Sequence, residues 1–213
     1  MRTAVVILVL LVAHRASADM CGPAGVAEMT AKIEQRARLA KPEAETIFVW
    51  ATCLRDMHDA VQADSDLPGR LLAACIKLLD KIPEDPLCVE VAARLGKAEL
   101  GGHDIVAAVA KQPNRFEDAR PNDLIAAIGA PRGAAVVIAR WKQLVPAAAK
   151  KERDADAMNS WAAWRLSAAA ALGITGDADA RAFLEEQAKA TIDRGVKRAC
   201  AAAIAAIDKR HPR

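Results

Sequence analysis

Apolar residues recur along most of the chain at the three- and four-residue spacing of an amphipathic helix, and long alternating runs are rare. Residues 132–145 show this most clearly, with apolar side chains at i, i+3, i+4, i+7, i+10 and i+11. Proline, glycine and aspartate interrupt the pattern at intervals that suit short helices. The sequence therefore predicts an all-α chain. Helices are expected at about residues 27–40, 43–62, 68–81, 86–99, 103–111, 121–128, 132–145, 155–172, 177–190 and 193–209.

The predicted last helix is apolar on two sides and unusually rich in alanine. Its main stripe consists of Val196, Cys200, Ala203, Ile204 and Ile207. Further alanines widen the apolar surface to a second side, and such a helix packs between neighbours rather than on one core. The chain has no Tyr and only three Phe, so small and aliphatic residues are expected to form most of the core.

The same pattern repeats along the C-terminal half. A shift of 32 residues superposes 164–172 on 196–204. The segments "AARLG" and "IAAIG", which end at Gly96 and Gly129, are 33 residues apart. The interval from Gly129 to Gly173 is 44 residues, as if one unit held an insertion of eleven residues near "PAAAKKERDADAM". The positions predicted to pack one unit on the next are Ala168, Ala171, Leu172, Cys200, Ala203 and Ile204. Units of this size built from two helices are typical of α-solenoids.

At these residues the chain resembles the HEAT-like repeat family, in which the first helix of a unit follows Asp-x-x-Val-Arg-x-x-Ala-x-x-Ala-Leu-Gly. Residues 193–204 fit this frame, and "ALGITGDADARAFLEEQ" fits the Gly-Asp turn and second helix. The chain departs from the pattern at three positions. Trp161 and Trp164 stand where the family has Asp and Val, and Cys200 stands where it has Ala. The resemblance covers 155–209 well and 83–145 weakly. It implies a right-handed α-solenoid of stacked antiparallel helix pairs, with small residues that let helix axes approach towards the close end of ~8–10 Å.

The N-terminus has the three parts of a secretory signal. "MR" is a basic start, "TAVVILVLLVA" is an apolar run too short to span a bilayer, and "HRASA" ends in small residues. The alternative is a buried N-terminal helix. Cleavage after Ala18 predicts an exported chain that begins at Asp19, and no later segment is long and uncharged enough to cross a membrane. The expected organisation is a signal peptide at 1–18, a segment with one helix at 19–42, a repeat domain at 43–209 and a tail at 210–213.

Five cysteines follow the predicted signal, and an exported chain meets an oxidising compartment. A disulfide between Cys53 and Cys75 is predicted across the turn "ADSDLPG", because the flanking helices should form an antiparallel hairpin. Pairing of Cys75 with Cys88 across "IPEDP" has a comparable offset along the helices and stays open. Cys200 is expected to remain a small buried hydrophobic residue.

No motif in the sequence indicates catalysis. Removal of the signal lowers the formal net charge from +3 to +1, because two arginines leave with it, and so gives no electrostatic case for nucleic acid. The three Asp-x-Asp pairs are interpreted as helix caps rather than as metal ligands; they are Asp64/Asp66, Asp154/Asp156 and Asp177/Asp179. No zinc spacing, nucleophile motif or phosphate-binding glycine loop is present. We expect no catalytic residues, metal or cofactor.

Two groups of residues are candidates for contact with a partner. Lys150, Lys151 and Arg153 form a basic cluster in the predicted insertion, which would suit an acidic partner or a phospholipid surface; a solvated loop is the alternative. Trp161 and Trp164 share one helix face, where a wedge in the core is favoured over an exposed anchor.

The resemblance and the signal together predict an exported helical-repeat module for binding or scaffolding in the cell envelope or outside it. The expected partner is a protein of the envelope, with neither nucleic acid nor a membrane span involved. The alternatives are an enzyme of lyase type on a HEAT-like scaffold, since some members of that family attach bilin chromophores, and a purely structural envelope protein.

Overall fold

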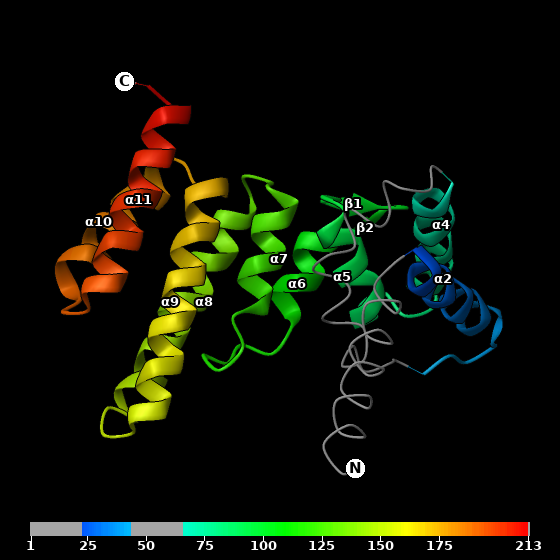
Figure 1. Ribbon diagram of the computed structural model, residues 1–213, viewed down its shortest axis with the longest axis horizontal. Coiled ribbons are helices and arrows are strands. Elements are labelled where there is room, and N and C mark those ends of the chain that lie inside the picture. Colours follow the sequence, from blue (N-terminus) through cyan, green and yellow to red (C-terminus); the bar gives the residue numbers. More distant parts are fainter. Residues whose placement is uncertain (1–22, 44–65, 213) are drawn as a thin grey trace, which may run out of the picture. The chain divides into compact units, whose positions relative to one another are not determined.

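The computed structural model describes residues 23–43 and 66–212, and within them the chain is helical apart from one very short hairpin (Figure 1). The all-α prediction is confirmed. The predicted signal at 1–18 and nearly all of the predicted helix at 43–62 lie outside the described residues. The helices are α2 (Pro23–Arg38), α4 (Leu67–Leu79), α5 (Pro86–Arg94), α6 (Ile105–Lys111), α7 (Arg120–Ile128), α8 (Gly133–Ala149), α9 (Ala155–Thr175), α10 (Ala178–Ala190) and α11 (Arg194–Arg210).

The chain divides into two units, each with its own internal packing. The described residues up to Leu95, with Glu99–His103, form an N-terminal unit. Gly96–Ala98 and the residues from Asp104 onwards form a C-terminal unit. The division falls inside the segment 43–209 that the repeat pattern assigns to one domain.

In the N-terminal unit, α4 packs against both α2 and α5. Arg36 near the end of α2 forms an ion pair with Asp85, the N-cap of α5, at 2.6 Å between Nη2 and Oδ2. Lys81, just after α4, donates hydrogen bonds to the carbonyls of Ala37 and Leu39 at 2.6 and 2.7 Å. The connection between α4 and α5 is therefore fastened to the end of α2.

The helix expected at 86–99 is shorter than predicted, because α5 ends at Arg94. Gly96 has φ +69°, a left-handed conformation that a helix does not continue through. The strands β1 (Glu99–Leu100) and β2 (His103–Asp104) then pair around Gly101 and Gly102, at φ +56° and +85°. These two glycines make the turn of the hairpin.

The C-terminal unit arranges its helices in two rows. In the first row, α9 packs against α7 and α11; in the second, α8 packs against α10 (Figure 1). The rows meet where α7 and α9 contact α8 and where α10 contacts α11, while α6 packs on α7. Every helix from α7 to α10 therefore has neighbours in both rows.

Helices α9 and α10 of this unit each begin directly after an aspartate that caps them. Asp154 accepts from the backbone N–H of Ala157 at 3.0 Å, and Asp177 accepts from Asp179 and Ala180 at 3.1 Å each. The prediction that these two Asp-x-Asp pairs cap helices is confirmed. It is wrong for Asp66, which stands at the N-cap of α4 without a capping bond from its side chain. Here Pro68 removes one of the N–H donors that such a bond would use.

The helix expected at 132–145 extends further, because α8 continues through Pro146 to Ala149. A proline inside a helix removes one backbone hydrogen bond. Pro146 is exposed, so the carbonyl that loses its donor lies on the solvent side of the helix. The helix therefore tolerates the proline and continues until it reaches the basic cluster, which follows its last residue.

Candidate interaction surface on helix α8

The six predicted repeat-packing positions lie on α9 and α11, two helices that pack against each other. Ala168, Ala171 and Leu172 of α9 are fully buried, and so is Cys200 of α11; Ala203 is buried and Ile204 half-buried. A Cβ atom added to Gly173 would stand 3.1 Å from the Cα of Ala203. Small residues therefore set the distance between the two helices.

The aromatic residues of the unit gather in one cluster. The rings of Trp161 and Trp164 stack with centroids 5.5 Å apart, and Trp141 of α8 meets both edge to face at 6.2 and 5.9 Å. Phe183 of α10 packs edge to face on Trp141 at 5.5 Å. Trp161 is 6% exposed and Trp164 is fully buried. Both tryptophans are therefore too buried to contact a partner and form the core wedge that the sequence favours. Trp141, which the sequence does not single out, lies at the centre of this wedge.

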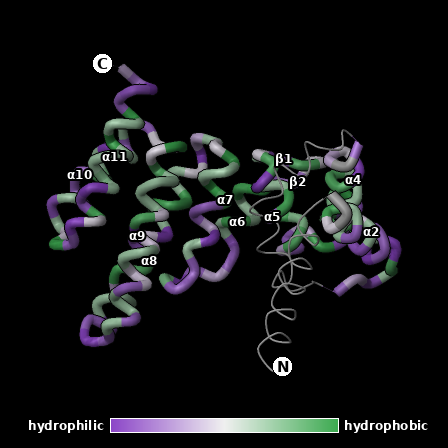
Figure 2. Tube along the Cα trace, in the orientation of Figure 1, coloured by the Kyte–Doolittle hydropathy of each residue, from purple (hydrophilic) through white to green (hydrophobic). Residues whose placement is uncertain are grey.

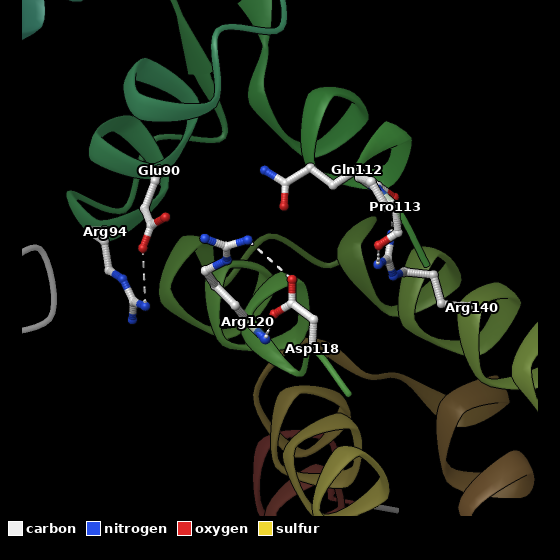
Figure 3. A network of polar contacts seen from close by, with 7 residues as sticks. All are labelled: Glu90, Arg94, Gln112, Pro113, Asp118, Arg120 and Arg140. Atoms are coloured by element: carbon white, nitrogen blue, oxygen red, sulfur yellow. Dashed lines mark hydrogen bonds and ion pairs between the residues drawn. The ribbon is translucent and has the colours of Figure 1, made fainter. Parts of the chain in front are cut away.

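Arg140 fixes the back of α8 to the connection between α6 and α7. Its guanidinium is buried and donates to the carbonyls of Gln112 and Pro113, each at 3.0 Å (Figure 3). Burial lowers the pKa of Arg140, and the carboxylate of Asp118 acts in the opposite direction. The sequence pattern gives no indication of this contact, because charged residues on amphipathic helices are mostly solvated.

The opposite face of α8 is largely apolar and open to solvent. Val145 is 46% exposed, and Lys142 is the charged side chain on this face. The exposed or half-buried apolar residues here are Ala135, Ile138, Ala139, Val145, Pro146 and Ala149. They follow the three- and four-residue spacing of one helix face, which we call the α8 outer face.

A groove lies at the N-terminal end of the α8 outer face. Its lining includes Ala135, Ile138 and Ala139 of α8, together with Asp177 and Asp179 from the start of α10. Asp177 is held in place by its capping bonds to the first turn of α10. Arg132 and Lys142 also line the groove, so this end of the face carries charges of both signs.

The predicted basic cluster lies at the other end, in the turn between α8 and α9. Figure 2 shows this turn as a hydrophilic tip between two largely hydrophobic helices. Lys151 is 3.4 Å from Glu117 and lies over the ring of Phe116 at 5.1 Å. Lys150 and Arg153 are exposed, and their side chains make no hydrogen bond or ion pair within the described part of the chain. Two cationic groups are therefore available at this end of the α8 outer face.

The cysteines separate into two groups. Cys200 is buried as expected, and burial raises the pKa of its thiol. Cys75 is buried in the N-terminal unit beside Cys88. The predicted partner Cys53 lies outside the described residues, so that pairing stays a prediction.

Within residues 23–43 and 66–212, no group of three or more His, Cys, Asp or Glu side chains is placed to hold a metal ion. No helix in the same ranges is long and apolar enough to cross a membrane. Comparison of the chain with protein-family models, curated proteins and solved structures gives no match.

Proposed function

We propose that the chain is an exported α-solenoid of the HEAT-like kind that binds a protein partner in the cell envelope or outside the cell, without catalysis of its own. The two rows of helices in the C-terminal unit support the solenoid part of this proposal. In such arrays each helix pair buries its apolar face against the next, and the contact of α9 with α11 through Gly173 and Ala203 has this character.

The α8 outer face is the observation that supports binding. Apolar side chains of one helix face remain exposed here, although α8 buries its other side against α9 and α10. Contiguous exposed apolar surface on a folded protein marks an interaction site. Solenoids present such surfaces to macromolecular partners.

The charges at the two ends define the partner further. Both signs of charge occur at the groove end, where Arg132 and Lys142 lie with Asp177 and Asp179, whereas Lys150 and Arg153 lie beyond the other end. A helical segment with an apolar stripe and an acidic end that meets Lys150 and Arg153 complements this surface.

Co-purification from an envelope extract tests this proposal. Ile138→Glu and Val145→Glu place carboxylates on the α8 outer face and should release the partner that the unmodified chain retains. Leu166→Glu is the matched control, because Leu166 on α9 is 41% exposed and lies outside this face. A partner recovered equally with all three variants would contradict the assignment of the surface.

Export has a separate test. The mature chain should begin at Asp19 and be found outside the cytoplasm. Mass-spectrometric detection of an intact Met1 in the envelope fraction would contradict export by this signal.

A further inference from the structure

Two buried cysteines of the N-terminal unit, Cys75 on α4 and Cys88 on α5, lie side by side. The helices pack against each other, both side chains are fully buried, and the two thiols are within hydrogen-bonding reach. Cys75 precedes the last residue of α4 by four positions, and Cys88 follows the first residue of α5 by two. At about 1.5 Å of rise per residue, they stand roughly 6 and 3 Å from the connection between the helices.

The surroundings hold Cys88 in this position. Its backbone N–H donates to Oδ1 of Asp85 at 3.1 Å, and Oδ2 of Asp85 is bound by Arg36. Leu78, Leu79 and Leu87, from the same two helices, are fully buried. The first turn of α5 is therefore fixed against α4 where the two thiols meet.

We propose that Cys75 and Cys88 form a disulfide bond that joins α4 to α5 in the exported protein. The two thiols lose two protons and two electrons as the S–S bond forms. An oxidant of the disulfide class takes up both and becomes two thiols; oxidised glutathione serves this purpose in the test tube.

The bond belongs to the folding of the chain rather than to a reversible switch. Hydrogen bonding with Cys75 and burial both raise the pKa of the Cys88 thiol, so the reactive thiolate is scarce once the unit has folded. Thiol–disulfide exchange at these cysteines is therefore fast before the unit has folded and slow afterwards. The proposal depends on the proposed export only for the compartment, because the pairing can be tested in vitro.

The bond would compete with the predicted Cys53–Cys75 pairing for the same thiol. Peptide mapping separates the two outcomes, because the relevant tryptic peptides each contain one cysteine. Cleavage after Arg70, Lys77, Lys81 and Arg94 places Cys75 in residues 71–77 and Cys88 in 82–94. Cys53 falls in residues 39–55, since the Lys41-Pro42 bond resists trypsin.

The full chain is refolded with oxidised and reduced glutathione, treated with iodoacetamide and digested without reduction. The expected product is peptide 71–77 linked to 82–94, with a mass equal to their sum less two hydrogens. Alkylated Cys75 and Cys88, or a link from 39–55 to 71–77, would overturn the proposal whatever the fate of the proposed function.

Thermal unfolding gives a second readout. Oxidised Cys53→Ser should melt about 6–12 °C above its own reduced form, the shift expected for closing a loop of about a dozen residues in a chain of this length. Cys53→Ser/Cys88→Ser should lose the difference between its oxidised and reduced forms. Because each variant is compared with itself, a general loss of stability does not obscure the result. Equal melting temperatures for the two forms of Cys53→Ser would overturn the proposal.

Discussion

At the contact between α9 and α11, single residues decide how closely two helices approach. A Cβ atom at position 173 would lie 3.1 Å from the Cα of Ala203, so a larger residue here would force the two helices apart by a few tenths of an ångström. Ala171 is fully buried and Ala203 is 4% exposed. The alanine-rich pattern that marks these helices in the sequence is therefore a packing feature in the structure.

Replacing Ala171 or Ala203 by leucine should lower the free energy of unfolding by roughly 1–3 kcal/mol, because the added methylenes have no space. Urea unfolding measures the change. Ala202→Leu is the control on the exposed side of α11 and should stay within about 0.5 kcal/mol of the unmodified chain. If both buried variants unfolded at the same urea concentration as the unmodified chain, the close contact would be wrong.

The buried guanidinium of Arg140 gives a second prediction about a single residue. Arg140→Met keeps the length of the side chain but leaves the carbonyls of Gln112 and Pro113 without their donor, which should cost about 2–4 kcal/mol. Arg140→Lys should restore only part of this, because an ammonium lacks the planar fork. Arg115→Met, at an exposed position, is the matched control. A variant Arg140→Met as stable as the control would contradict the structural role of the buried guanidinium.

Among the elements, helix existence could be predicted from the sequence better than helix ends. Apolar spacing located every helix from α4 to α11. It missed the end of α5, since Gly96 turns the chain by a local conformation that periodicity does not encode. It also ended α8 at Pro146, because the rule that proline stops a helix takes no account of which side faces water.

The turn between α8 and α9 is the element with the sharpest binding prediction. The double variant Lys150→Glu/Arg153→Glu should weaken partner binding about 3- to 30-fold at low salt, and less at high salt, because rim charges act through screened attraction. Titration of the purified partner measures the effect. Lys189→Glu/Lys197→Glu changes the net charge equally at exposed positions on α10 and α11. An equal loss of affinity in both double variants would show a general charge effect instead.

For the whole molecule, the candidate site could be predicted only in part. The basic cluster was visible in the sequence because three cations occur within four residues. The α8 outer face was not visible in the sequence. Ile138 and Val145 share one apolar pattern with Val137 and Trp141, which the structure buries. A helix that is apolar on two sides does not reveal which side meets its neighbours. Only the rows of packed helices separate the inner side from the outer.

The central claim is that the α8 outer face binds a protein, and site-specific photo-crosslinking in the producing cell tests it most directly. A photoreactive amino acid at Ala139, exposed on that face, should yield one discrete adduct with a second polypeptide in the exported fraction. The same group at Ala201, exposed on α11, should yield none. Absence of an adduct at Ala139, or equal adducts at both positions, would contradict the account.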